Sequence, residues 1–193
     1  EGSSTALSWL IFCLSKHLRI QEKIKQKLRE NQLLDKETFT IEELNQLDYL
    51  DFVIAEVMRW APNFDFTART LTKDDFLPAS NVQLYKGESV LIAFYNLSHD
   101  SRYWNIDPER FYPERFQEKR HPLAWLPFGA GPRNCVGMRF AMLEIKSALV
   151  KILRRYTISS SEQTLSRFAE HERFVISPKN GIWIRLQRRD DQM

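Results

Sequence analysis

The chain has 193 residues, of which 43% are hydrophobic and 12% are aromatic, so it can fill a folded core and is not a disordered tail. Its 28 basic and 25 acidic side chains leave a net charge of +3, which is too small to indicate a nucleic-acid-binding protein. Cys13 and Cys135 lie far apart without Cys or His at ligand spacing, so we expect neither a disulfide framework nor a structural zinc site. The apolar stretch 6–14 is too short to span a membrane.

Helical periodicity dominates the first 60 residues. Residues 5–31 are predicted to form helix with a break near His17, because apolar residues recur at three- and four-residue spacing on both sides of it. Thr40 and Glu43 have the spacing of a capping box, which predicts a short helix there. A further helix is predicted over residues 48–60, ending before Pro62.

The periodicity then changes to that of short strands, followed by an irregular segment. Strands are predicted at 68–72, 82–84 and 89–93, with a turn at Lys86-Gly87. Residues 104–134 contain five prolines and many aromatic side chains, so we expect an irregular but buried segment.

The last third of the chain is predicted to hold one long helix and a hairpin. The helix covers residues 137–155, and residues 174–176 pair with 182–186 across a Pro-Lys-Asn-Gly turn. The predicted fold class is therefore α+β, mainly helical, with small β-sheets.

The most distinctive motif is the run from Phe128 to Gly137, Phe-Gly-Ala-Gly-Pro-Arg-Asn-Cys-Val-Gly. Its glycines and proline predict a tight turn that presents Cys135 just before a helix, where unpaired N–H groups and the helix dipole are expected to lower the pKa of the thiol. Gly137 allows a flat group to approach the backbone. A thiolate with Arg133 nearby suits an axial ligand to haem iron, with the arginine pairing a propionate.

Judged alone, a cysteine at a helix start is most often a structural residue, but the complete pattern is much rarer. Five fixed residue types in ten positions occur by chance about once in a few million start points, taking each type as roughly one in twenty. These five are Phe128, Gly131, Arg133, Cys135 and Gly137. The sequence thereby resembles the cytochrome P-450 family of haem-thiolate monooxygenases, whose F-x-x-G-x-R-x-C-x-G signature it matches at every fixed position. The resemblance implies that Cys135 ligates the iron of haem b and that Phe128 packs beside it.

Glu56 and Arg59 fall one turn apart, opposite the apolar stripe of the predicted helix 48–60. Their spacing alone would make an exposed ion pair worth about 0–1 kcal/mol. In the resembled family this E-x-x-R pair is buried and joined by an arginine from the segment before the cysteine loop. That segment holds Pro-Glu-Arg-Phe twice, and the second copy makes Arg115 a better match than Arg110. The resemblance thus implies a buried structural charge cluster.

Further assignments rest on the resemblance alone. An arginine at the place of Arg69 reaches a haem propionate in the family, the alternative being a surface arginine. The opening Glu1-Gly-Ser-Ser-Thr5 looks like the middle of the family's distal helix, in which Thr5 would orient dioxygen and relay protons. Ser4 stands where that helix has an acidic residue, and its hydroxyl would hold a water instead. Without the resemblance, this run would be an ordinary helix N-cap.

Two branches of the family remain open. Glu1, Arg120-His-Pro and Lys179-Asn-Gly-Ile are similar to the fatty-acid ω-hydroxylase branch, in some members of which that glutamate forms an ester with haem. The Gly-Met-Arg-Phe-Ala run at 137–141 is equally like the steroid- and drug-oxidising branch.

The resemblance implies an enzyme that inserts one oxygen atom of O2 into a lipophilic substrate, namely a fatty acid, steroid or xenobiotic. Electrons would come from an NADPH-dependent reductase. Basic residues near the loop could form its docking surface, the alternative being that they form only a solvated surface. Those residues are Lys119, Arg120, Arg133, Arg139 and Lys146. The alternatives are a catalytically inactive haem-binding or scaffold protein, a haem-thiolate isomerase, and an interaction domain with a structural Cys135.

The resemblance extends over nearly the whole chain but matches only the C-terminal portion of one P-450 domain, from the distal helix through the cysteine loop to a C-terminal hairpin. Since residue 1 is Glu rather than Met, we expect residues 1–193 to be a piece of a longer protein. The remainder would carry a membrane anchor, which implies the cytosolic face of the endoplasmic reticulum membrane. We expect this piece alone to neither hold haem nor turn over substrate.

Overall fold

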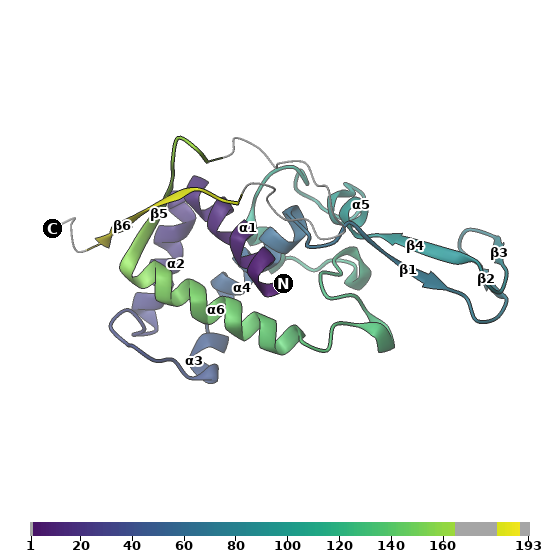
Figure 1. Cartoon of the computed structure of the whole chain (residues 1–193), viewed down its shortest axis with the longest axis horizontal. Helices are drawn as coiled ribbons and strands as arrows, with labels where there is room; N and C mark the ends of the chain where they lie inside the picture. The colour runs from purple at the N-terminus through teal and green to yellow at the C-terminus, as the bar shows by residue number, and fades with distance from the viewer. Residues whose placement is uncertain (1, 165–180, 190–193) are drawn as a thin grey trace.

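The computed structural model describes residues 2–164 and 181–189, and it places a helical body at one end and a narrow antiparallel ribbon at the other (Figure 1). The α-helices are α1 (Gly2–Lys16), α2 (Leu18–Glu30), α3 (Ile41–Asn45), α4 (Asp48–Trp60), α5 (Phe94–His99) and α6 (Met138–Arg155). The strands are β1 (Phe66–Thr70), β2 (Asp75–Leu77), β3 (Val82–Leu84), β4 (Ser89–Ala93), β5 (Tyr156–Ser160) and β6 (Ile184–Arg188). The class is α+β and mainly helical, as predicted.

The helical body agrees closely with the periodicity of the sequence. The chain breaks at His17 between α1 and α2, and α4 has the predicted bounds. The capping box of α3 is complete, since the Glu43 N–H donates to Thr40 Oγ1 (3.2 Å) and the Thr40 N–H donates to Glu43 Oε2 (3.0 Å). None of the helices among the described residues combines the length and the apolar character needed to cross a bilayer.

The core forms where α1 packs against α4, α6 and β5. Trp9, Leu10 and Leu14 of α1 are fully buried. The buried amide of Gln21 joins helix to strand, because its Nε2 donates to the carbonyl oxygens of Leu14 and Ile158 (both 2.7 Å) while its Oε1 accepts from the Ile158 N–H (2.9 Å). These bonds tie α2 to both α1 and β5.

Strands β1 and β4 form the ribbon that extends from the helical body (Figure 1). They pair antiparallel from Phe66 opposite Ala93 to Thr70 opposite Ser89. Strand β1 therefore begins and ends two residues earlier than predicted, while β4 has the predicted bounds. The short hairpin β2–β3 continues the ribbon, and sequence analysis found only its second strand.

The C-terminal hairpin was predicted with a different pairing. Strand β6 overlaps the predicted strand 182–186, but it pairs antiparallel with β5, from Tyr156 opposite Arg188 to Ser160 opposite Ile184. The predicted partner, 174–176, lies outside the described residues. Sequence analysis missed β5 because it follows the last residue of α6 directly, with no Gly or Pro to mark the change.

The segment predicted to be irregular contains three short 3₁₀ helices with proline in their first turns, η1 (Pro113–Gln117), η2 (Pro122–Ala124) and η3 (Gly131–Arg133). Proline suits these positions because its φ is already near the helical value and a first-turn N–H needs no partner. η1 packs against α4, and η3 leads into α6, so this segment carries the loop that holds Cys135.

Candidate functional site

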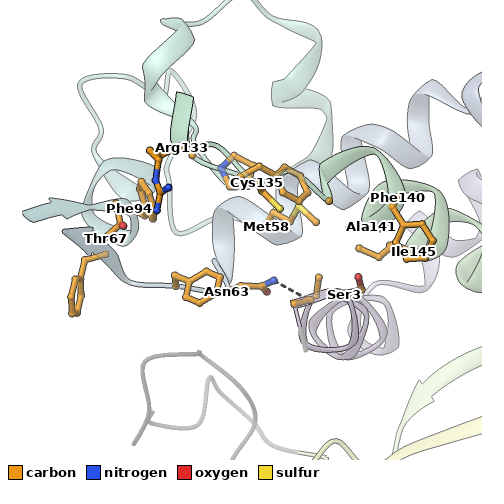
Figure 2. A pocket seen from close by; sticks show the side chains of 18 of the residues that line it. Ser3, Met58, Asn63, Thr67, Phe94, Arg133, Cys135, Phe140, Ala141 and Ile145 are labelled. Atoms are coloured by element: carbon orange, nitrogen blue, oxygen red, sulfur yellow. Dashed lines mark hydrogen bonds between the residues drawn. The ribbon is translucent and has the colours of Figure 1, made fainter. Parts of the chain in front are cut away.

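A cleft of about 490 Å³ opens between the first turn of α1, the segment after α4, strand β1 and the start of α6 (Figure 2). Its volume is in the range of cavities that hold one organic ligand. Aromatic and aliphatic side chains predominate in its lining, among them Met58, Phe64, Phe94 and Phe128. An apolar ligand would therefore gain free energy by leaving water for this cleft.

The cysteine loop presents Cys135 at the mouth of the cleft. The Cys135 N–H donates to the Phe128 carbonyl oxygen (2.8 Å), which closes the loop, and the thiol is exposed. Gly129 and Gly131 have φ of +71° and +74°, values that residues with a side chain rarely adopt. A Cβ at Gly137 would lie 3.9 Å from the sulfur, so the glycine keeps that side of the thiol open.

Apolar side chains around the thiol are exposed to an unusual degree. Val136 is fully exposed, Phe140 is 72% exposed and Met138 is 38% exposed. Scattered apolar residues at a surface are ordinary, but Phe140 also lines the cleft, where its exposed ring can contact a bound apolar group. The geometry suits a flat, apolar group lying against the start of α6 and the sulfur.

Two arginines give the cleft positive charge. Arg133, from η3, lies in Figure 2 on the same side of the cleft as Thr67 and Phe94. Arg69 of β1 also lines the cleft, and its Nη1 donates to Thr67 Oγ1 (2.9 Å) and to the Ala68 carbonyl oxygen (2.8 Å). Among the described residues no acidic side chain lines the cleft, so the pair suits a ligand with two carboxylates.

The first turn of α1 faces the cleft with Gly2, Ser3 and Ala6, but not with the two residues for which a role was predicted. Thr5 is only 8% exposed and Ser4 is exposed, and within the described chain neither lines the cleft. Each residue turns a helix by about 100°, so the face that carries positions 2, 3 and 6 directs positions 4 and 5 elsewhere. Glu1 lies outside the described residues.

A buried charge cluster lies on the other face of α4. Arg59 Nε and Nη2 donate to the two carboxylate oxygens of Glu56 (2.8 and 3.0 Å), and Arg115 Nε lies 3.1 Å from Glu56 Oε2. The Tyr112 N–H donates to Glu56 Oε1 (2.7 Å). Glu56 and Arg59 have no exposed surface, and Arg115 is 4% exposed. The structure thus brings the three predicted residues into one buried cluster.

Arg115, not Arg110, occupies the third position of this cluster. Its Nη1 and Nη2 donate to the carbonyl oxygens of Ile106 (2.8 Å), Asp107 (3.0 Å) and Arg110 (2.6 Å), so its guanidinium fastens the loop before η1. Burial lowers the pKa of Arg115, and the negative charge of Glu56 opposes that change. The guanidinium of Arg110 instead lies over the ring of Tyr112 (5.2 Å).

Two of the basic residues expected on a docking face, Lys146 and Arg120, are held by other contacts. Lys146 is buried and therefore does not lie on such a face. It is 4% exposed and its Nζ donates to Asp51 Oδ2 (2.8 Å) and the Leu44 carbonyl oxygen (3.2 Å). Its place on α6 faces α3 and α4, which sequence spacing from the cysteine did not reveal. Arg120 lies over the rings of Phe116 (4.3 Å) and Trp125 (5.5 Å).

Asn63 lines the cleft three residues after Trp60, the last residue of α4, and sequence analysis did not identify it. Asn63 Nδ2 donates to the Gly2 carbonyl oxygen (2.9 Å), which ties the start of α1 to this segment, as the dashed line in Figure 2 shows. Within the described chain, its Oδ1 is buried without a hydrogen-bond partner. Only its place after Pro62 could have drawn attention to it.

Comparison with known proteins gives one consistent family. The profile of the family described as cytochrome P450 matches residues 1–185. Cytochrome P450 4V2 of Mus musculus is 37% identical to the chain, and the alignment covers 99% of the chain and 36% of that protein. A probable cytochrome P450 6a13 of Drosophila melanogaster is 35% identical, with 97% and 39% covered. Cytochrome P450 4X1 of Mus musculus is 34% identical, with 97% and 37% covered. The chain therefore spans somewhat more than a third of the length of these relatives.

Proposed function

The chain belongs to the cytochrome P450 family, and we propose that within the complete protein it forms the thiolate side of the haem site of a monooxygenase. The observation that carries this proposal is the exposed Cys135 thiol, set at the mouth of an apolar cleft beside Gly137 and two arginines.

The residues of the cleft fit the haem that the family implies. Haem iron needs few ligands from the protein, because the porphyrin nitrogens supply four, and a single cysteine sulfur suffices on one side. Accordingly, the site needs no cluster of metal-binding side chains, and the described residues contain none with three or more members. The flat apolar macrocycle and its two propionates match the exposed Phe140 and the arginine pair, Arg69 and Arg133.

Each residue has a distinct role in the proposal. Cys135 Sγ would hold the iron, and the glycine at 137 leaves the sulfur accessible. Arg133 and Arg69 would pair the propionates, and Phe128 would pack beside the loop. Haem with a thiolate ligand supplies oxygen activation and O–O cleavage, which side chains cannot perform alone.

The buried cluster has a structural role in this proposal. Glu56 and Arg59 hold α4, and Arg115 connects them to the segment that precedes the cysteine loop. Since the charges satisfy one another in the interior, the cluster sets the position of the loop and does not touch the ligand.

The proposed reaction inserts one oxygen atom of O2 into a lipophilic substrate, with electrons from an NADPH-dependent reductase at the endoplasmic reticulum membrane. A lipophilic substrate is proposed on the family membership of the chain, because the apolar lining of the cleft is assigned to haem. A fatty acid is our preferred class, on the similarity of Glu1, Arg120-His-Pro and Lys179-Asn-Gly-Ile to the ω-hydroxylase branch. A haem ester at Glu1 is tested by acid digestion and solvent extraction of the holoprotein, and haem that leaves freely ends that part of the proposal.

The primary test uses the protein expressed from its complete gene. After reduction and addition of carbon monoxide, a strongly red-shifted Soret band is expected for the wild type and for the matched control Cys13→Ser. Cys135→Ser should lose that band. A normally placed band in the wild type would exclude thiolate ligation, and the absence of haem from all three proteins would favour an interaction domain with a structural Cys135.

A catalytically inactive haem-binding protein is the second candidate, favoured by the placement of α1. Thr5 is buried, Ser4 replaces the expected acidic residue, and within the described chain neither lines the cleft. Turnover separates the two. The monooxygenase requires product that depends on NADPH and reductase, whereas the inactive protein shows the haem spectrum without product. Product that forms without NADPH would identify the isomerase alternative.

A further inference from the structure

A second cavity, of about 280 Å³, lies at the other end of α6 from the cysteine loop. It is lined by Glu37, which belongs to the loop before α3, and by Lys151, Arg154 and Arg155 of the last turns of α6. The 18 residues of α6 span about 27 Å, and Figure 1 shows the length of this helix. The residues of α6 that line this α6-end cavity are therefore remote from the start of the helix, which lines the Cys135 cleft. The inference drawn from it does not depend on haem.

The α6-end cavity carries an excess of positive charge. Three basic side chains face one carboxylate, which gives a formal charge of +2. Lys151 stands three and four residues before the two arginines, so the three project from the same side of the helix. Like charges at this spacing repel one another. An anion bound between them would replace that repulsion with attraction.

Arg154 supplies an observation that charge alone does not. Its Nη1 is buried and has no hydrogen-bond partner within the described part of the chain. Its guanidinium lies 5.7 Å from the centre of the Phe39 ring, which holds the group in place. Basic residues in a last turn also complement the helix dipole, but the dipole does not account for a buried N–H group without an acceptor.

We propose that the α6-end cavity binds a phosphate-type oxyanion, such as a phosphate monoester or a diphosphate. Two guanidinium groups can each donate paired hydrogen bonds to such oxygens, and the third cation adds charge without a fixed direction. A ligand with two or more negative charges matches the net charge of the lining better than a single carboxylate does. The cavity also has room for an organic group attached to the phosphate.

The test is calorimetric titration with sodium pyrophosphate at constant ionic strength, on the haem-loaded protein expressed from its complete gene. Arg154→Gln removes the guanidinium whose Nη1 is buried, and the exposed Arg19 of α2 provides a matched control, Arg19→Gln, with the same change in charge. We expect saturable binding that Arg154→Gln weakens by about tenfold or more, since bonds to a charged partner are lost. Arg19→Gln should change affinity by less than about twofold. Equal weakening in both variants, or no saturable heat in the wild type, overturns the proposal.

Lys151→Gln keeps the test decisive if Arg154→Gln fails to retain the haem spectrum, because Lys151 is exposed and its loss leaves the interior unchanged. Its binding should weaken as well, and unchanged binding in that case overturns the site. Vesicles identify the source of the phosphate. Binding to phosphatidic acid but not phosphatidylcholine, with competition by pyrophosphate, assigns a lipid headgroup. Binding of pyrophosphate without a difference between the vesicles assigns a soluble ligand.

Discussion

Folded proteins usually keep charged side chains at the surface and apolar side chains in the interior. The cluster of Glu56, Arg59 and Arg115 departs from the first tendency, and the cleft around Cys135 departs from the second. The cluster places three charges in the interior, with no exposed surface at Glu56 or Arg59. The cleft places apolar side chains at the surface, with Phe140 72% exposed beside a free thiol. Residues of the same chain complete the first arrangement, whereas the second would be completed by the bound group that we propose.

The difference indicates which region governs folding and which governs binding. Every described contact of the Glu56 carboxylate comes from Arg59 of α4, from Tyr112 just before η1 or from Arg115 within η1. Substitutions in the cluster should therefore act on stability, even when no ligand is present. Substitutions in the cleft should act on haem and leave the fold in place.

The largest effect is expected when the carboxylate is removed from the cluster. Glu56→Ala would leave two buried guanidinium groups without their counter-charge, which costs about 3–5 kcal/mol of unfolding free energy. The matched control is Glu30→Gln, which breaks the exposed pair with Lys27 and should leave stability unchanged. Urea denaturation followed by circular dichroism measures both. Equal stability of the two variants would show that the cluster does not hold the fold.

The two Pro-Glu-Arg-Phe copies give a sharper test of the same region. Arg115→Lys cannot reproduce the donors to Glu56 and three carbonyl oxygens, so it should cost about 2–3 kcal/mol. Arg110→Lys changes an exposed guanidinium and should have no measurable effect. Thermal unfolding of both variants measures the difference. A larger loss in Arg110→Lys would reverse the assignment.

The two cysteines extend the comparison to a single residue type. Cys13 is 3% exposed in the core, and burial raises the pKa of its thiol, whereas Cys135 is exposed. In the haem-free protein, Cys13→Ser should lose about 1–2 kcal/mol by burying a hydroxyl, and Cys135→Ser should retain full stability. A thiol reagent added to haem-free protein should label Cys135 first. Fast labelling of Cys13, with Cys135 protected, would contradict the assigned environments.

The division between the buried cluster and the cleft could be predicted in part from the sequence. How much could be predicted differs between the two regions. The cysteine loop is local, because its glycines, arginine and thiol lie within ten residues. The cluster joins residues almost 60 positions apart, and the spacing of Glu56 and Arg59 alone indicated an exposed pair. Burial comes from the segment before η1, whose irregular course no periodicity could specify. The second Pro-Glu-Arg-Phe copy was chosen from the resemblance, not from spacing.

The orientation of side chains within helices was the other limit. Lys146 lies near the cysteine loop in sequence, yet it pairs with Asp51 across the α4 interface. Thr5 and Ser4 lie beside residues that line the cleft, yet the helical turn directs them elsewhere. A single sequence indicates which face of a helix is buried only where the apolar stripe is continuous. The first turn of α1 has no such stripe.

The smallest effect concerns pH and the neighbourhood of the buried cluster. His17 stacks on Phe111 (4.8 Å), which precedes the Tyr112 N–H that donates to Glu56. Burial, followed by the positive charge of Lys16, lowers the pKa of His17 from its ordinary value of 6.5. As pH falls through 6.5, the unfolded chain takes up the proton first, so folding becomes less favourable down to the lower folded-state pKa. His17→Phe retains the stacking without the titration, and the fall in melting temperature between pH 7.5 and 5.5 should be smaller in this variant than in the wild type. An identical pH dependence in both proteins would show that protonation of His17 is not coupled to folding.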